Sequence, residues 1–456
     1  LSPGIVSARL SEEDYSNNFS DAYPGFTNYE AKVEADRCYF CYDAPCISAC
    51  PTEINIPLFI RQISTEMEEE AAKTIFDQNI LGGMCARVCP TETLCEEACV
   101  REAAEGKPVK IGRLQRYATD TLMNNNVHPY YRDETNGKKI AVIGSGPAGL
   151  ACSHRLAMLG YDVEIFESKS KAGGLNEYGI ATYKSVDNFA SKEIDWLLKI
   201  GGIKINFNKT LGKDFSIDEL RKSFDAVFIG CGLQDTNKIS INDSSDKLVE
   251  DAVDFIADLR QVNDFSSLPI GRNVVVIGGG MTAIDAAVQS QLLGAEKVTI
   301  IYRRNLDNMS ASQKEQNNAT SKGVKIIANA IPTAIEKEND IHKLKLSYTE
   351  VDNETGQLKE LNQTFSIEAD QIFCAIGQKF SNLLDVFQSK KGKIMIDSDC
   401  KTSVANVWAG GDCVDKGEDL TVSAVAQGRD AAQSIHKSII SKELNPLLIL
   451  FEIFIC

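Results

Sequence analysis

Hydrophobic positions divide the chain into a helical region and a region in which strands alternate with helices. From about residue 31 to residue 126, apolar residues recur at helical spacing, as in IGRLQRYATDTLM (111–123), and Pro57 suits a first helical turn. After residue 138, short β-branched runs such as KKIAVIG, VEIFE and NVVVIGGG alternate with helical segments. This alternation is typical of parallel α/β sheets.

Three segments depart from this pattern. Residues 1–30 contain few apolar repeats and many Ser, Asn, Asp and Glu, so we expect a loosely structured arm. The segment 127–138 is polar, contains Pro and Gly, and is expected to be a linker. The last ten residues, LLILFEIFIC, are apolar but interrupted by Glu452, and we interpret them as a truncation or sequencing artefact. Leu1 in place of Met indicates a fragment or a processed form.

Size and charge narrow the class of protein. A chain of 456 residues, 43% hydrophobic and 25% charged, is expected to form about three globular domains. The formal net charge of −16 argues against nucleic acid as a partner, because phosphates require a basic surface. No apolar run is long enough to span a membrane, and no secretory leader opens the chain, so we expect a cytoplasmic protein without a membrane partner.

Eight of the fourteen cysteines lie between residues 38 and 99, in two blocks. The first block has the pattern C-x2-C-x4-C-x3-C-P and the second has C-x3-C-P-x4-C-x3-C. Thiolates are soft ligands that suit iron, and four of them saturate one [4Fe–4S] cluster, so the count predicts two clusters. The eight cysteines are Cys38, Cys41, Cys46, Cys50, Cys85, Cys89, Cys95 and Cys99.

Zinc and disulfides are the alternative interpretations of these cysteines. Two structural zinc sites remain the main rival, but none of the four histidines lies in the cysteine region, and the Cys-Pro steps match ferredoxin runs better than zinc knuckles. Disulfides are disfavoured because nothing indicates an oxidising compartment. The pattern therefore favours clusters that carry single electrons.

The first candidate nucleotide site is the segment IAVIGSGPAG (140–149), which follows a strand and opens a helix. Gly144 is expected to make the tight turn, Gly146 to let the backbone approach a pyrophosphate, and Gly149 to allow close helix–strand packing. Glu167 ends the next strand, where a carboxylate can accept both ribose hydroxyls. The expected cofactor contacts are Gly144, Ser145, Gly146, Ala148, Gly149, Glu167, Gly174 and Leu175.

The second candidate nucleotide site is the segment VVVIGGGMTA (274–283). Here Tyr302 aligns with the acid of the first site, and Arg303 and Arg304 follow it. Guanidinium groups bind phosphate in bidentate fashion, so we expect this site to accept NADPH through its 2′-phosphate, with NADH as the alternative. The expected contacts are Gly278, Gly280, Thr282, Ala283, Arg303 and Arg304.

A third marker, VWAGGD (407–412), comes far down the chain. A strand that ends in Gly411-Asp412, followed by a helix from about Thr421, can place a carboxylate on the ribityl or pyrophosphate portion of a flavin. Because this marker follows the second site, it predicts that the FAD domain is split and that the NAD(P)H domain is inserted in it.

The order of an eight-cysteine module, a flavin unit and an inserted nicotinamide unit resembles one family. It contains the small subunit of glutamate synthase, the N-terminal half of dihydropyrimidine dehydrogenase and the small NAD(P)H-oxidising subunit of the bacterial enzyme. The resemblance covers roughly residues 10 to 440 and is carried by the segments DRCYFCYDAPC (36–46), NILGGMCARVCPTETLCEEACVREAAEGKPV (79–109), IGRLQRYATD (111–120), GGLNEYGIATYKSVDNFA (173–190) and GGGMTAIDAAVQSQLLGAEKVTIIYRR (278–304). Among its branches, segment 179–186 favours the dihydropyrimidine branch over glutamate synthase.

The resemblance implies how the cysteines are divided between the clusters. Counting cysteines would make Cys85 the last ligand of the second cluster, but the resemblance implies Gln115 in that role. One [4Fe–4S] cluster would be held by Cys38, Cys41, Cys46 and Cys99, and the other by Cys50, Cys89, Cys95 and Gln115.

The implied fold is α plus α/β: a helical double-cluster domain followed by two Rossmann-like domains. The expected limits are an arm (1–30), the iron–sulfur domain (31–126), a linker (127–138), the first segment of the FAD domain (139–237), the NAD(P)H domain (238–378), the second segment of the FAD domain (379–440) and an atypical tail (441–456).

By resemblance, the chain would take a hydride from NAD(P)H to FAD and pass electrons through the clusters to an FMN-containing partner that reduces uracil or thymine. A hetero-oligomer is therefore expected. Hydride transfer requires no protein acid or base, so no catalytic side chain is assigned. The alternatives are a glutamate synthase small subunit, an NADPH:ferredoxin oxidoreductase subunit, and a zinc-stabilised, nucleotide-sensing interaction protein without redox turnover.

Overall fold

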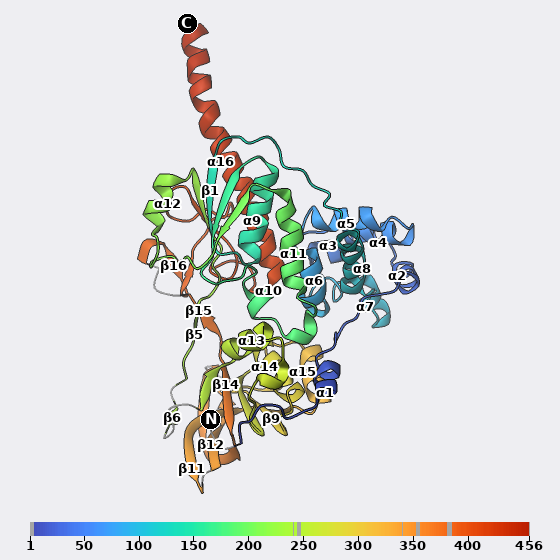
Figure 1. Cartoon of the computed structure of the whole chain (residues 1–456), viewed down its shortest axis with the longest axis vertical. Coiled ribbons are helices and arrows are strands. Elements are labelled where there is room, and N and C mark those ends of the chain that lie inside the picture. Colours follow the sequence, from blue (N-terminus) through green and yellow to red (C-terminus); the bar gives the residue numbers. More distant parts are fainter. Residues whose placement is uncertain are drawn as a thin grey trace. The chain divides into compact units, whose positions relative to one another are not determined.

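In the computed structural model, the chain divides into two compact units (Figure 1). The structure describes residues 4–239, 241–243, 248–339, 341–352, 356–380 and 385–455, without the side chains of 242–243 and 442–455. The first unit joins residues 1–22, 178–187 and 235–378, and the second joins residues 23–177, 188–234 and 379–456. Each unit therefore combines segments that lie far apart in the sequence.

The N-terminal portion of the second unit is a helical domain. Its core is formed by apolar residues at helical spacing, including Phe59, Ile63, Ile75, Phe76 and Leu114, which are almost fully buried. The helices predicted around Pro57 and at 111–123 are confirmed. The helices are α2 (Asn28–Ala35), α3 (Pro45–Ser48), α4 (Ile56–Ser64), α5 (Glu68–Phe76), α6 (Gly82–Val88), α7 (Val100–Glu105) and α8 (Ile111–Asn124).

The remainder of the second unit is built around a five-stranded parallel sheet, in the order β18-β4-β1-β2-β3. Its strands are short, apolar and buried, as expected of a sheet covered on both faces. The strands are β1 (Lys139–Ile143), β2 (Asp162–Phe166), β3 (Ile203–Asn206), β4 (Ala226–Ile229) and β18 (Val407–Ala409). The accompanying helices are α9 (Pro147–Met158), α10 (Leu175–Tyr178), α11 (Phe189–Leu197), α12 (Ile217–Ser223) and α16 (Thr421–Ile455), of which α16 lies beside α9 (Figure 1).

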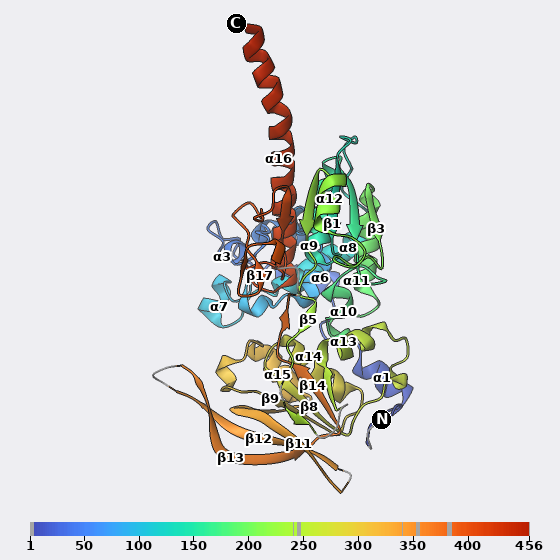
Figure 2. The same cartoon turned by 90° about the vertical axis from the view of Figure 1, so that its left-hand side faces the viewer.

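The first unit contains another parallel sheet, in the order β10-β9-β8-β14-β7. An additional sheet, largely antiparallel, which the sequence analysis missed, packs on one face of it through Ile335, Leu344 and Leu346 (Figure 2). The elements of the parallel sheet are β7 (Val249–Asp251), β8 (Asn273–Gly278), β9 (Lys297–Ile301), β10 (Lys325–Ile327) and β14 (Gln371–Ala375), with helices α13 (Ala252–Gln261), α14 (Met281–Leu292) and α15 (Gln313–Ser321). The other sheet contains β6 (Asn242–Asp243), β11 (Ala330–Glu338), β12 (Ile341–Val351) and β13 (Leu358–Glu368). Two short pairs, β5 (Asp235–Thr236) with β15 (Gln378–Lys379) and β16 (Ser389–Lys390) with β17 (Lys393–Ile394), complete the strands described.

The prediction of a loosely structured arm at residues 1–30 is wrong. Helix α1 (Glu12–Asn18) begins with a capping box at Ser11, and α2 begins with another at Thr27. Tyr15 and Phe19 are buried in the core of the first unit. The two aromatic residues anchor a segment whose composition alone looked polar. At the other end, the backbone of α16 continues to Ile455, while the side chains of the predicted tail from residue 442 lie outside the described residues.

Candidate functional site

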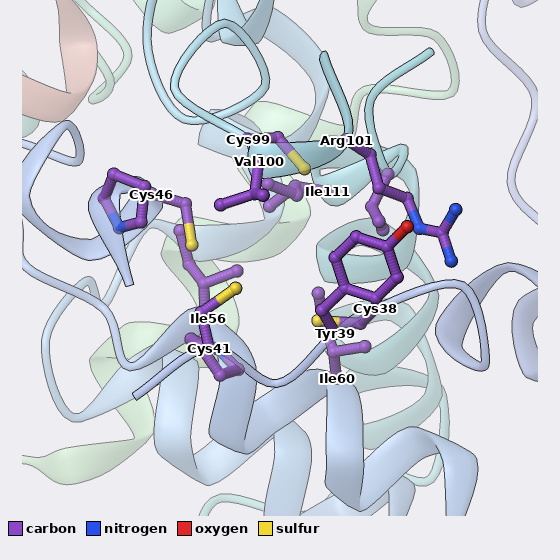
Figure 3. Close-up of a pocket in the computed structure, with 13 residues that line it drawn as sticks. Cys38, Tyr39, Cys41, Cys46, Ile56, Ile60, Cys99, Val100, Arg101 and Ile111 are labelled. Carbon is purple, nitrogen blue, oxygen red and sulfur yellow. The ribbon is translucent and has the colours of Figure 1, made fainter. Parts of the chain in front are cut away.

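Four thiols converge on a pocket in the helical domain (Figure 3). Cys38 follows α2, Cys46 lies in α3, and Cys99 precedes α7, so helix ends position most of the group. The rest of the lining is largely apolar and includes Ile56, Ile60, Val109 and Ile111. The structure brings together Cys38, Cys41, Cys46 and Cys99.

This donor set fits an iron–sulfur cluster better than a single ion. Burial, and after it the neighbouring thiols, raises the pKa of Cys46 to about 12, and burial also raises the pKa of Cys38. Such thiols stay protonated near neutral pH unless a bound cationic centre converts them to thiolates. Within the region of the chain that the structure describes, no three Cys, His, Asp or Glu side chains lie close enough to hold one metal ion. Four thiols spaced around one pocket suit a ligand larger than a single ion, such as an iron–sulfur cluster.

A second group of thiols lies next to the first. The Cys89 thiol lies near the thiols of Cys85, Cys95 and Cys50, and Cys95 in turn lies near Cys50 and Cys46. Burial raises the pKa of both Cys89 and Cys95 well above the usual value. The proximity of Cys46 to Cys95 makes the two thiol groups neighbours, as single-electron transfer between two clusters would require.

Gln115 and Cys85 lie on two helices that face each other. Cys85 is buried in α6, beside the thiol of Cys50. Gln115, in α8, donates a hydrogen bond from Nε2 to the carbonyl oxygen of Gly82, over 2.7 Å. This bond uses the amide nitrogen and leaves Oε1 as the atom that could act as a ligand. The assignment of Gln115 as a cluster ligand stays a prediction.

The first dinucleotide loop has the geometry that its glycines predict. β1 leads through Gly144, whose φ is +93°, into α9, and Gly146 is the N-cap. A Cβ on Gly149 would overlap the carbonyl oxygen of Gly144, so only glycine allows the helix to lie this close to the strand. Ser145 and Ala148 are buried in the same turn. The N-terminus of α9 can therefore meet phosphate oxygens.

Glu167 organises this loop in a way the sequence analysis did not foresee. Its Oε2 accepts hydrogen bonds from the Ser145 backbone N–H at 2.9 Å and from the Ser145 hydroxyl at 2.5 Å. Its Oε1 accepts bonds from the Lys169 N–H at 2.8 Å and from the Ser168 hydroxyl at 3.3 Å. A carboxylate has about four acceptor positions, so the chain itself uses them all. Ribose hydroxyls would have to replace the serine hydroxyls.

The residues predicted from the later flavin markers lie at the same end of the sheet. Gly174, with φ +55°, contacts Gly146, and a Cβ on it would lie 2.8 Å from the Gly146 Cα. Leu175 begins α10 and is exposed. Gly411 lies against Ala148 in α9. Asp412 is the next residue, so its backbone is held near the start of α9. Burial raises the pKa of Asp412 to about 6.

The sequence analysis predicted a helix from about Thr421 at this site, which is confirmed, but it missed the contacts that α16 makes there. Gly411 N–H donates to Gln427 Oε1 at 2.6 Å, and Thr421 Oγ1 donates to Asn176 Oδ1 at 3.0 Å. A Cβ on Gly428 would overlap the carbonyl oxygen of Ala148, so α16 and α9 meet backbone to backbone. A glycine inside an otherwise helical pattern was the available signal.

The second dinucleotide loop, in the first unit, repeats the strand–turn–helix arrangement. Gly278 has φ +149°, and a Cβ there would overlap the carbonyl oxygen of Ala375 in β14. Gly280 is the N-cap of α14, and Ala283 is fully buried in that helix next to Thr282. The loop is therefore built to leave backbone N–H groups at the start of α14.

Tyr302 and the two arginines after it directly follow strand β9. The ring of Tyr302 packs on Gly279, and its hydroxyl donates to the carbonyl oxygen of Asn308 at 2.6 Å. The Arg303 and Arg304 side chains are exposed, and neither makes a hydrogen bond or ion pair with any residue that the structure describes. Both guanidinium groups are available to an anionic ligand.

Comparisons with known proteins match the two regions of the chain that contain the thiols and the dinucleotide loops. The family described as "Dihydropyrimidine dehydrogenase domain II, 4Fe-4S cluster" matches residues 15–127, and the family "Pyridine nucleotide-disulphide oxidoreductase" matches residues 138–428. None of the helices, over the residues that the structure describes, has the length and apolar character needed to cross a membrane.

Two kinds of relative cover nearly the whole chain. The NAD-dependent dihydropyrimidine dehydrogenase subunit PreT of Salmonella typhimurium is 35% identical over 422 residues, which is 92% of this chain and 97% of the relative. The Glutamate synthase [NADPH] small chain of Escherichia coli K12 is 32% identical over 442 residues, covering 91% and 93% of the two chains.

A solved structure agrees with the fold. Mycobacterium tuberculosis FprA, in complex with NADPH, has a TM-score of 0.56 at 17% identity and covers 68% of this chain and 86% of its own. The helical domain with its thiols, the two dinucleotide loops and the matches over both regions lead to one conclusion. The chain is an oxidoreductase and belongs to the pyridine nucleotide-disulphide oxidoreductase family, in the group that carries a [4Fe–4S] domain of the dihydropyrimidine dehydrogenase type.

Proposed function

We propose that this chain is the electron-input subunit of a dihydropyrimidine dehydrogenase. In this proposal it oxidises NAD(P)H at FAD and passes electrons through two [4Fe–4S] clusters. An FMN-containing partner would then reduce uracil or thymine to the 5,6-dihydro form. The names of the relatives that are 35% identical over 92% of the chain support this substrate class.

One observation carries the proposal. The thiols of Cys38, Cys41, Cys46 and Cys99 surround one hollow, and they belong to the same compact unit as the first dinucleotide loop. A cluster in that hollow and a flavin on that loop would therefore be held by one folded body. This is what electron transfer between fixed centres requires, because its rate depends on their separation staying small.

The chain's own residues act by binding and orientation. When bound, the flavin supplies hydride acceptance and single-electron release, and the clusters supply single-electron transport. Glu167 fixes the turn at Ser145, and the glycines let the pyrophosphate approach the start of α9. The second thiol group would hold its cluster with Cys50, Cys89 and Cys95, together with Gln115.

We assign FAD to residues 139–237 and 379–440 and NAD(P)H to residues 238–378, inserted between them. The compact segment 235–378 supports this division. The exposed side chains of Arg303 and Arg304, which have no partner among the described residues, support the 2′-phosphate of NADPH as a ligand. The dihydropyrimidine dehydrogenase relatives are named NAD-dependent, which makes the coenzyme preference a direct test.

Anaerobic purification tests the core of this proposal. The protein should contain about eight iron and eight sulfide per chain if it holds two cubane clusters, together with bound FAD. It should reduce artificial acceptors with NAD(P)H. A colourless protein containing zinc would contradict the proposal and support a structural, nucleotide-sensing role instead.

A glutamate synthase small subunit is the second candidate, since that relative is 32% identical over 91% of the chain. An NADPH:ferredoxin oxidoreductase subunit would share the same cofactors. Purification of the native partner distinguishes them. The complex should turn over uracil if the first proposal holds, glutamine plus 2-oxoglutarate if the second does, and ferredoxin alone if the third does.

A further inference from the structure

A buried arginine in α16 contacts the loop that follows one of the cluster cysteines. Arg429 Nη1 donates to the carbonyl oxygen of Thr52 at 2.8 Å, and to Gln78 at 3.1 Å (main-chain O) and 2.6 Å (Oε1). The arginine, Thr52 and Gln78 all belong to the second unit. Arg429 is buried although it carries a charge, so its position is defined by these acceptors.

The rest of the chain fixes where this arginine lies. Its neighbour Gly428 meets the backbone of Ala148 in α9 so closely that a Cβ would not fit. Helix α16 therefore cannot slide along α9, the helix that begins at the first dinucleotide loop. Arg429 Nε is bonded to Asp430 at 2.8 Å, and that carboxylate is half exposed. The carboxylate offsets some of the charge and leaves Nη1 directed to Thr52.

Thr52 connects the arginine to a cluster cysteine. It is fully buried two residues after Cys50, and its Oγ1 lies 3.3 Å from the Cys50 Sγ. A cysteine that binds iron is a thiolate without a proton, so the hydroxyl must be the donor of this bond. Hydrogen bonds to cluster sulfur stabilise the more negative, reduced cluster and raise its reduction potential.

We propose that Thr52 sets the reduction potential of the cluster that Cys50 helps to hold, and that Arg429 is the positioning residue that holds Thr52 in place. This inference rests on the proposed function. Thr52 acts directly, through its hydroxyl on the sulfur. Arg429 acts through the Thr52 carbonyl oxygen and adds a partly compensated positive charge nearby. Together they favour the reduced state of the cluster of Cys50.

The test is redox potentiometry of the anaerobic holoenzyme, followed by EPR of the reduced clusters. Thr52→Val removes the hydroxyl at nearly constant volume. At a fixed potential it should lower the reduced-to-oxidised ratio of one cluster about fivefold, as expected for the loss of one ordinary hydrogen bond, and leave the other cluster unchanged. Thr52→Ser keeps the donor and should restore the ratio. Thr65→Val, at an exposed threonine of the same domain, is the matched control and should change neither cluster.

Variants of Arg429 provide an independent test of the proposal. Arg429→Gln should lower the same ratio by less than Thr52→Val does, and Arg429→Lys should retain most of it. An unchanged ratio in Thr52→Val with full iron content, or equal shifts in the valine and serine variants, would overturn the inference. If the valine variant loses iron, an unchanged ratio in Arg429→Gln overturns it. A wild-type protein without iron or EPR signal would instead contradict the proposed function itself.

Discussion

The two dinucleotide loops share one backbone design and differ in the chemistry around it. In both, a buried strand ends in a glycine with positive φ, and a glycine caps the next helix. Glu167 accepts hydrogen bonds from the first loop, and Asp412 directly follows Gly411, which contacts Ala148 in α9. At the end of the second strand of the other loop stand Tyr302 and two exposed arginines.

The contrast separates what holds a pyrophosphate from what chooses a nucleotide. The strand–turn–helix supplies N–H groups and is common to both loops because every dinucleotide has a pyrophosphate. The residue after the second strand differs because ribose hydroxyls suit a carboxylate, whereas a 2′-phosphate suits guanidinium groups. Changes to the shared backbone should therefore abolish binding, and changes to the flanking side chains should alter stability or preference.

The largest effect is expected at Gly149, the third position of the shared motif, which is Ala283 in the second loop. Gly149→Val places a side chain on the Gly144 carbonyl oxygen, so α9 must move away from β1. The protein should then contain almost no flavin, measured as the ratio of visible to ultraviolet absorbance. Iron content should fall less than flavin content, because the candidate cluster cysteines lie at residues 38–99, outside the turn that the substitution disturbs.

The matched change in the second loop is Ala283→Gly, since alanine already occupies that place. It should lower the free energy of unfolding by only about 1 kcal/mol, through the poorer helix propensity of glycine, and leave flavin content unchanged. A flavin-replete Gly149→Val protein would contradict the argument that α9 must pack this closely on the first loop.

The next largest effect is expected for the stability of a variant at Asp412. Burial raises its pKa from 3.8 to about 6, with Asp419 adding to the rise and Lys393 opposing it. A raised carboxyl pKa means that the folded protein resists ionisation, so stability is lost as the pH rises from about 4 to about 6. Asp412→Asn removes the charge and should stabilise the flavin-free protein by roughly 3 kcal/mol near pH 7.5 and about half that near pH 5.

The fluorescence of Trp196 and Trp408 can follow this unfolding, since the chain has two tryptophans and both lie in the second unit. Thr65→Val, at an exposed residue of the same unit that has no titratable group, is the control. It should show little pH-dependent gain. An equal gain for the Asp412 variant at both pH values would contradict the burial argument.

Coenzyme preference is the third test of the comparison. Changing Arg303 to Glu and Arg304 to Ala removes both phosphate ligands and introduces a carboxylate for the ribose. The ratio of kcat/KM for NADPH to that for NADH should fall at least tenfold, because one charge-assisted hydrogen bond is worth about 1.5–3 kcal/mol. Lys297→Ala, at the start of the same strand, is the control with one charge removed elsewhere. An unchanged ratio in the double variant would rule out the arginines as phosphate ligands.

Local pattern predicted the features of the site that depend on backbone geometry. The glycines of both loops, the helix at 111–123 and the start of α16 near Thr421 follow from spacing and from short buried strands. These features depend mainly on residues that are close together in the sequence. The ligand set around Cys38 followed from a resemblance, because spacing alone left open which cysteines share a cluster.

Features that depend on distant partners were missed. Tyr15 and Phe19 are buried because α1 packs on a core formed by residues from position 181 onward, which no local pattern in a polar segment reveals. The strands β11–β13 were overlooked because charged residues punctuate them and leave many of their positions exposed. The hydrogen bonds that Glu167 accepts from its own loop were also missed, because a sequence motif predicts an acid at this position but not its hydrogen-bond partners.

The smallest effect is expected at Tyr302, which occupies the position that Glu167 has in the first loop. Its hydroxyl bonds the Asn308 carbonyl, so Tyr302→Phe should cost about 1 kcal/mol locally and speed hydrogen exchange over residues 302–308. The phenyl ring still covers Gly279, and both arginines remain, so the NADPH-to-NADH preference should not change. A shift in preference would mean that the tyrosine hydroxyl contacts the nucleotide itself. The second loop would then select its ligand as the first is expected to, by a group placed directly after the strand.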